Sequence, residues 1–240
     1  MEHETVLKLG VECWNVWREK NPEIRPDLDG ADLRNTDLKG ANFGPAADTA
    51  LHDLSAMPGN TAKPDLARMG MRLEGADLCG ADLTGACLLG ARLSGAKLRN
   101  TVLAGVNATG ADFMEADLSN ADFRGATLAR AVFNDAILNG ADFANAMLRD
   151  AHLFGANLRG LNLAGVDLGG AALTDANLSG ACLKGANLSG ALLIDANLRD
   201  ADLDGANFSG ADLRGAVLAD ARTDGANFEG ALRDETTVEC

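Results

Sequence analysis

The chain has very few of the residues that build catalytic and metal sites. Its 240 residues include no tyrosine, two tryptophans and three histidines. No cysteine neighbours His3, His52 or His152 in the sequence, whereas zinc sites need such ligands in close pairs. General acid–base chemistry would fall to surface carboxylates, which open solvent holds at ordinary pKa values. We therefore predict no enzymatic activity, no metal site and no cofactor.

Long apolar runs and paired cysteines are also missing. No stretch approaches eighteen apolar residues, and the first ten residues lack a basic segment followed by an apolar one, so we expect neither a membrane span nor a secretory signal. Five cysteines are an odd number without close pairing, which favours reduced thiols over a disulfide framework. These features together predict a cytoplasmic protein.

A period of five residues dominates what the sequence does contain. From Leu73 to Phe228 a Leu or Phe returns at nearly every fifth position, and the residue two places earlier is small, usually Ala. In extended backbone, residues two apart point to the same side. Each unit then ends in Gly, Asn or Asp, which tolerate turn conformations. The chain should therefore wind as short edges joined by corners. An α-helix is excluded because its apolar positions fall three and four apart.

The motif Ala-(Asp or Asn)-Leu within this period resembles the pentapeptide-repeat family, as in Ala76-Asp77-Leu78, Ala141-Asp142-Phe143 and Ala186-Asn187-Leu188. The resemblance implies an all-β fold, a right-handed quadrilateral parallel β-helix with four units, or about twenty residues, in each coil of the solenoid. The N-terminal residues that precede the repeats resemble the leader segment of bacterial pentapeptide-repeat proteins.

Departures from the period divide the chain into segments. A parallel stack leaves unpaired strand edges at its ends, so we expect caps. Residues 4–20 predict an amphipathic α-helix with Val6, Leu9, Cys13, Val16 and Trp17 on one stripe and Leu7, Val11 and Trp14 beside it. No such helix follows Arg233, so the last coil would be closed by a few residues or by a second copy in a homodimer. The predicted segments are a helical cap at 1–26, a first coil at 27–43, an inserted loop at 44–70, a β-helix of about eight coils at 71–231 and a tail at 232–240.

If residues twenty apart stack directly, one side of the rod exposes apolar residues where the motif has polar ones. An acidic corner runs beside it. Apolar surface with a charged border is typical of association sites, although single exposed hydrophobic residues are ordinary. The candidate contact residues are Met114, Val132, His152, Phe154, Ala172, Leu192 and Ile194, and the acidic corner column is Glu115, Asp135, Asp175 and Asp195.

A second side carries a column of carboxylates. Such a column is suited to a basic partner, but the motif itself supplies Asp before Leu, which favours a purely structural origin. The candidate acidic residues are Asp82, Asp122, Asp142, Asp202, Asp204 and Asp224.

The family resemblance also implies two functions. Some pentapeptide-repeat proteins are acidic rods that imitate duplex DNA, bind DNA gyrase or topoisomerase IV, and protect it from quinolones or peptide toxins. The net charge of −14 fits this role. However, residues 73–231 hold twenty acidic and eleven basic residues, a net of −9, while roughly 38 Å of DNA carries about 22 charges. We therefore favour a non-enzymatic scaffold or regulator that binds a protein, with the DNA mimic as the alternative, and expect no direct nucleic-acid binding.

Overall fold

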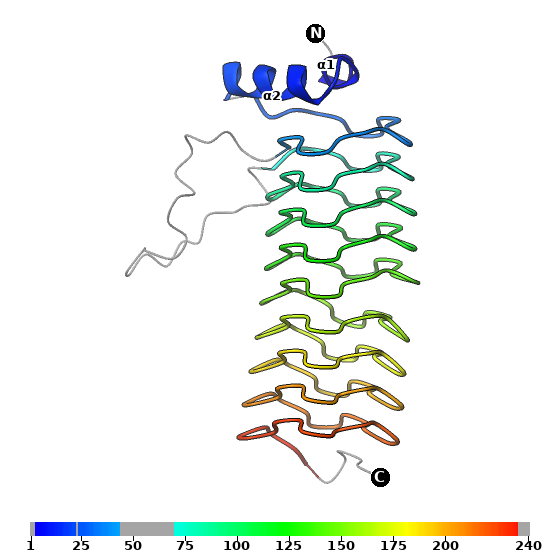
Figure 1. The fold of residues 1–240 in the computed structure, drawn as a ribbon, viewed down its shortest axis with the longest axis vertical. Coiled ribbons are helices and arrows are strands. Elements are labelled where there is room, and N and C mark those ends of the chain that lie inside the picture. The colour runs from blue at the N-terminus through cyan, green and yellow to red at the C-terminus, as the bar shows by residue number, and fades with distance from the viewer. Residues whose placement is uncertain (1–2, 23, 44–69, 235–240) are drawn as a thin grey trace, which may run out of the picture.

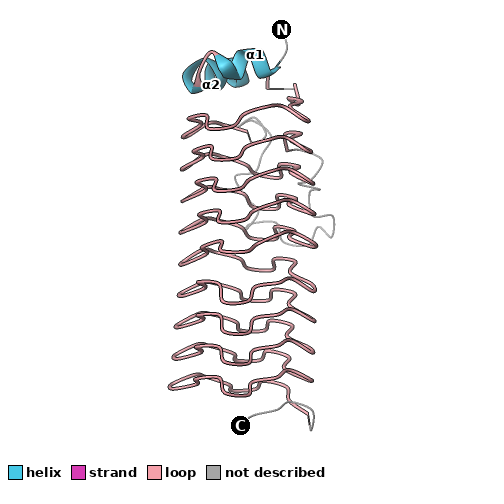
Figure 2. Cartoon of the chain, turned by 90° about the vertical axis from the view of Figure 1, so that its right-hand side faces the viewer, coloured by secondary structure: helices cyan, strands magenta, loops and turns pink. Residues whose placement is uncertain are grey.

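The structure is a computed structural model that describes residues 3–22, 24–43 and 70–234. Two helices, α1 (His3–Lys8) and α2 (Val11–Lys20), lie across one end of a rod (Figure 1). The rest of the described chain winds into stacked coils, which Figure 2 shows from a second side. The predicted inserted loop, apart from Gly70, and the end of the predicted tail lie outside the described residues.

Parallel bridges hold the coils in register. Each bridge residue pairs with the residue twenty positions later, as Asp122 does with Asp142 and Asp142 with Asn162. Four such positions recur in each coil, so the rod has four sides. Between the first coil and the next the offset is 45, as for Asp27 and Arg72, because the segment between them is longer. Each bridge is a single residue, so Figure 2 draws the coils as loops.

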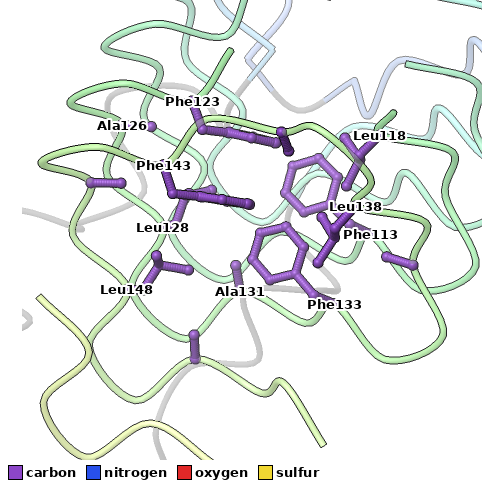
Figure 3. Close-up of a cluster of buried hydrophobic side chains, with 14 of the residues drawn as sticks. Phe113, Leu118, Phe123, Ala126, Leu128, Ala131, Phe133, Leu138, Phe143 and Leu148 are labelled. Carbon is purple, nitrogen blue, oxygen red and sulfur yellow. The ribbon is translucent and has the colours of Figure 1, made fainter. Parts of the chain in front are cut away.

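The interior is filled by the two inward positions of every unit. Leu118, Leu128 and the alanines beside them are fully buried. Four phenylalanines form two stacked pairs near the middle of the rod (Figure 3), Phe113 with Phe133 at 5.1 Å and Phe123 with Phe143 at 4.8 Å between ring centroids. Neighbouring pairs meet edge to face, a favourable arrangement for aromatic rings. A small apolar cavity of about 10 Å³ lies beside Phe143 and Leu148, which is at most the size of one water molecule and too small for a ligand.

The Asp or Asn of the motif has a structural task. Its side-chain oxygen accepts the backbone N–H two residues later, for example Asp122 Oδ1 from Arg124 at 3.0 Å and Asn207 Oδ1 from Ser209 at 3.1 Å. Such a contact caps the turn at the corner. The frequency of Asp on the outside of the rod is therefore partly explained by the backbone.

The N-terminal segment differs from the single helix expected over 4–20. The chain breaks at Leu9 and Gly10, where Gly10 has a φ of 109°, and gives two helices. The expected apolar stripe is wrong in part: Val6 is buried and Trp17 packs against the core, but Leu9 is 65% exposed, Val16 is 47% exposed and Cys13 is exposed. The break resets the helical phase, so the buried apolar residues of the two helices are Val6, Leu7 and Trp14.

Helix α2 contacts the first coil through its polar groups as well as its core face. Trp14 Nε1 donates to the Asn42 carbonyl at 2.8 Å, and the ring lies 5.6 Å from that of Phe43. Asn15 Nδ2 donates to the Gly40 carbonyl at 3.2 Å and its Oδ1 accepts the Asn42 N–H at 2.8 Å. These contacts satisfy backbone groups that a coil end would otherwise leave without partners.

Candidate interaction surface

The predicted apolar residues come together on one side of the rod. Bridges join Val132 to His152, His152 to Ala172, and Ala172 to Leu192 in direct succession. Four members are exposed: Phe154 at 58%, Leu192 at 45%, Met114 at 37%, and His152. We call this set the apolar stripe: Met114, Val132, His152, Phe154, Ala172, Leu192 and Ile194.

The apolar stripe interrupts the turn capping described above. In the coil before Val132, Asp112 Oδ1 accepts the Met114 N–H at 3.0 Å, and in the coil after Leu192, Asp212 Oδ1 accepts the Arg214 N–H at 3.3 Å. At the four central positions between, 132, 152, 172 and 192, neither Asp nor Asn is present. Elsewhere in the described coils, no more than two successive central positions on one side lack both Asp and Asn, as at 72 and 92 or at 127 and 147. A net hydrogen bond is worth about 0.5–1.5 kcal/mol, so the stripe is there at some expense of local stability.

The acidic corner column follows the apolar stripe directly. Its members Glu115, Asp135, Asp175 and Asp195 are all exposed and have φ of 58–59°. Asp and Asn adopt this left-handed conformation more readily than most residues, which accounts for the three aspartates. None of the four makes an ion pair with another described residue. The column therefore presents uncompensated negative charge along one edge of the stripe.

The predicted acidic side is arranged differently. Bridges place Asp122 beside Asp142, but Asn162 and Cys182 separate this pair from Asp202. The Asp122 carboxylate is occupied, because it accepts Arg124 through both oxygens at 2.8 and 2.7 Å.

Other members of the acidic side also have cationic partners. Arg222 lies against both Asp202 and Asp204, and Lys39 of the first coil lies 3.1 Å from Asp82. Hydrogen bonds from the Arg124 guanidinium lower the pKa of Asp122, and one from the Thr84 hydroxyl lowers that of Asp82. These contacts partly neutralise the side.

Sequence reasoning missed three exposed apolar residues of the coils and the ion pairs of the acidic side. Ile137 at 46% and Met147 at 45% exposure stand singly on two other sides of the rod, while Leu232 at 53% follows Asp212 on the side of the stripe. The same search for apolar residues at central positions finds all three. Lys39 could not be matched to Asp82, because its register depends on how the inserted segment reconnects the coils.

Other kinds of site find little support in the described residues. No group of three or more His, Cys, Asp and Glu side chains there could hold a metal ion. The four described cysteines, Cys13, Cys79, Cys87 and Cys182, are free thiols. No helix in the described ranges combines the length and apolar character needed to cross a membrane.

The family follows from the repeat itself. A family model of pentapeptide repeats matches eight copies, one over residues 25–44 and seven that together span residues 70–230 without a gap. The chain belongs to the pentapeptide-repeat family. It is accordingly a right-handed β-helix solenoid, and proteins of this family are generally structural or interaction proteins rather than enzymes.

Solved pentapeptide-repeat structures resemble this one over different extents. HetL of the cyanobacterium Nostoc sp. strain PCC 7120, involved in regulating heterocyst differentiation, is 28% identical over 90% of this chain and 92% of its own, with a TM-score of 0.30. A protein of the Arabidopsis thaliana thylakoid lumen is 40% identical over 38% and 64%, with a TM-score of 0.38. QnrB1, a plasmid-mediated fluoroquinolone resistance protein, is 18% identical over 87% and 89%, with a TM-score of 0.39. These likenesses assign no partner to this chain. No curated protein matches the sequence.

Proposed function

We propose that this pentapeptide-repeat protein is a non-enzymatic scaffold or regulator that binds another protein through the apolar stripe. The observation that carries the proposal is the loss of the turn-capping Asp or Asn in four successive coils, at 132, 152, 172 and 192. A surface that gives up stabilising contacts to expose apolar side chains is best explained by a partner that covers them.

Ordinary surface hydrophobic residues look different on this rod. Met147 has Thr127 and Asp167 as its bridge neighbours, and Ile137 follows Asp117 on its own side. Each stands alone among polar residues, as scattered exposed hydrophobic residues usually do. The stripe instead occupies successive coils at positions 132, 152, 172 and 192, with Asn134 and Thr174 as the polar residues between Met114, Phe154 and Ile194. Successive occupation of one side is typical of a contact surface.

Two variants test the proposal with a built-in control. Leu192 and Met147 are both 45% exposed and both occupy the central position of a unit. Asn is a normal residue there, so Leu192→Asn and Met147→Asn should both fold. In affinity capture from an extract of the cells that make the protein, we expect the specific partner to be retained by the wild type and by Met147→Asn, and lost with Leu192→Asn.

Salt gives a second readout in the same experiment. Apolar contact is weakly screened, so capture through the stripe should largely persist as ionic strength rises, with at most the few-fold loss expected from screening of the acidic corner column. Equal capture by Leu192→Asn and the wild type would contradict the proposal, because the stripe would then not be where the partner binds.

The alternative function is binding to DNA gyrase or topoisomerase IV in place of DNA. It is supported by the net charge of −14 and weakened by the ion pairs of Asp122, Asp202 and Asp204. A supercoiling assay with gyrase, at two salt concentrations and with or without a quinolone, separates the two. Inhibition or drug protection that fades as salt rises and is unaffected by Leu192→Asn would favour the DNA mimic.

A cytoplasmic location and a homodimer through the last coil stay predictions. Earlier coils donate backbone N–H groups to the next coil, as Leu203 does to Arg222 and Gly205 to Asp224. Among the described residues, Thr223 and Gly225 at the equivalent positions of the last coil have no such acceptor. Sedimentation analysis would show whether two copies pair there.

A further inference from the structure

The backbone beneath the apolar stripe is already fully engaged with neighbouring coils. The Val132 N–H donates to Ala111 O, the His152 N–H to Ala131 O, and the Val132 carbonyl accepts the Phe113 N–H, all at 2.8–2.9 Å. An extended peptide could not add to this side as a strand, because strand addition needs free backbone groups. A helix satisfies its own backbone, so it is the element that can bury an apolar face here.

The spacing of the stripe also suits a helix lying along the rod. Coils repeat about every 4.8 Å, and a helix rises about 5.4 Å per turn, so one side chain per turn meets roughly one coil. From Met114 to Ile194 the stripe crosses four coil steps, or about 19 Å. This distance corresponds to about 13 residues of helix.

The charge beside the stripe indicates what charge one flank of that helix carries. Asp122, Asp202 and Asp204 on the acidic side are paired with arginines, whereas the acidic corner column makes no ion pair with the described residues. Negative charge left without a counterion along an apolar edge favours a partner with basic residues beside its apolar face.

Glu115 adds an independent observation. Among the described residues with positive φ, only Glu115 and Arg130 are neither Gly, Asn nor Asp. Glu is disfavoured in this conformation, so its backbone does not explain its presence, as it does for Asp135 and Asp175. Strain kept at a surface position points to use of its side chain, and this side chain begins the acidic column.

A second copy of the chain fits the stripe poorly. The chain carries a net charge of −14, so two copies repel one another at long range whereas a basic segment is attracted.

We propose, building on the proposed function, that the apolar stripe and acidic corner column bind a basic amphipathic α-helix of a partner protein, about 13 residues long, with its lysines or arginines along the column. The binding energy is divided between the two surfaces. The apolar stripe provides the buried contact, and the column selects the charge of the flank.

The test uses synthetic helices and the full chain. The probe is a peptide of about 14 residues with one leucine per turn and lysines along one flank, labelled for fluorescence anisotropy. One control replaces each lysine with glutamate, and another keeps the composition but scrambles the apolar face. We expect binding of the lysine peptide alone, and loss of that binding with Leu192→Asn but not Met147→Asn.

A matched pair of double variants isolates the contribution that the charge of the acidic corner column makes to peptide binding. Asp175→Asn with Asp195→Asn removes two charges from the column, and Asp200→Asn with Asp220→Asn removes two from successive coils at a different corner. All four residues have φ of 57–60°, which Asn also adopts. We expect the first double variant to bind the lysine peptide about fivefold more weakly and the second to bind as the wild type does.

Failure of this inference can be told from failure of the proposed function. Equal binding of the lysine and glutamate peptides, lost with Leu192→Asn, would overturn the basic flank and leave the contact surface intact. No binding of either peptide, while affinity capture still depends on Leu192, would overturn the helical partner alone. A dimer in sedimentation that Leu192→Asn abolishes would make a second copy the occupant and overturn the inference.

Discussion

At the scale of single residues, the corners of this rod show why Gly alternates with Asn and Asp. Gly, Asn and Asp all adopt the left-handed backbone that a corner requires. In several places the side chain of one corner leans over the next, as Asn120 Oδ1 does over Gly140 and Asp150 Oδ1 over Gly170. A Cβ added to the second corner would meet that oxygen, so the neighbouring side chain would have to turn away, in addition to the strain of the residue's own φ.

Substitutions at two glycines distinguish the effect of the positive φ from the effect of the neighbouring side chain. Gly125 and Gly140 have φ of 65° and 72°, but only Gly140 has a side chain against it, that of Asn120. Gly125→Ala should lower the free energy of unfolding by about 1 kcal/mol through its backbone alone. Gly140→Ala should lower it further, because Asn120 must also move. Urea denaturation of the two variants measures the difference, and equal losses would contradict the neighbour effect.

A second prediction at this scale concerns pH. The Arg214 guanidinium binds both oxygens of Asp212 at 2.9 and 2.6 Å, and these hydrogen bonds lower the pKa of that carboxyl. A lowered folded-state pKa gives stability that is present above the unfolded value, near pH 4, and is lost as the pH falls through the folded value.

Asp212→Asn keeps an oxygen for the Arg214 N–H but cannot titrate. Thermal melts between pH 7 and pH 2.5 should show the variant less stable at neutral pH and with a smaller loss below about pH 4 than the wild type. Parallel pH profiles of the two proteins would mean that this pair contributes nothing to acid unfolding.

At the scale of elements, features that depend on local sequence could be predicted, and features that depend on long-range contacts could not. The residues that point inward and the residues at the corners can be identified from the five-residue spacing alone, because every unit has the same local structure. The break at Gly10 and the burial of Trp14 instead depend on how the helices meet Asn42 and Phe43. The pairing of Lys39 with Asp82 depends on the register across the inserted segment. The stripe could be located from sequence, but the ion pairs that distinguish the two acidic surfaces could not.

Trp14 is the residue that joins α2 to the coils. It is fully buried, packs on Phe43 and donates to Asn42. Trp14→Ala should cost about 3–5 kcal/mol at this end, whereas Val16→Ala on the exposed surface should cost little. Hydrogen exchange should show the loss at residues 40–43 and leave distant coils protected, since each coil contacts only its neighbours. Uniform loss of protection along the rod would contradict this local coupling.

At the scale of the whole molecule, stability is a sum over neighbouring coils, so position along the rod decides what a defect does. Phe133 is fully buried among three other phenylalanines, whereas Phe228 in the last coil is partly buried, stacks on Phe208 and lies under Arg233. The interior coil has neighbours on both sides, and the last coil has one among the described residues.

Phe133→Ala should therefore cost about 3–5 kcal/mol and split thermal unfolding into two transitions, because it weakens the link between two halves. Phe228→Ala should cost less and preserve a single main transition. Calorimetry distinguishes these outcomes, and a single sharp transition for Phe133→Ala at an unchanged temperature would contradict a stack coupled only through neighbours.

The central claim is that the apolar stripe is covered by another protein. Its most direct test places a photo-crosslinking amino acid at Leu192, and in a control protein at Met147, in the cells that make this chain. Both sites are 45% exposed at equivalent positions, so they sample random encounters equally. The account predicts a crosslink to one defined protein from position 192 and none above background from position 147. The same products from both positions, or none from either, would contradict it.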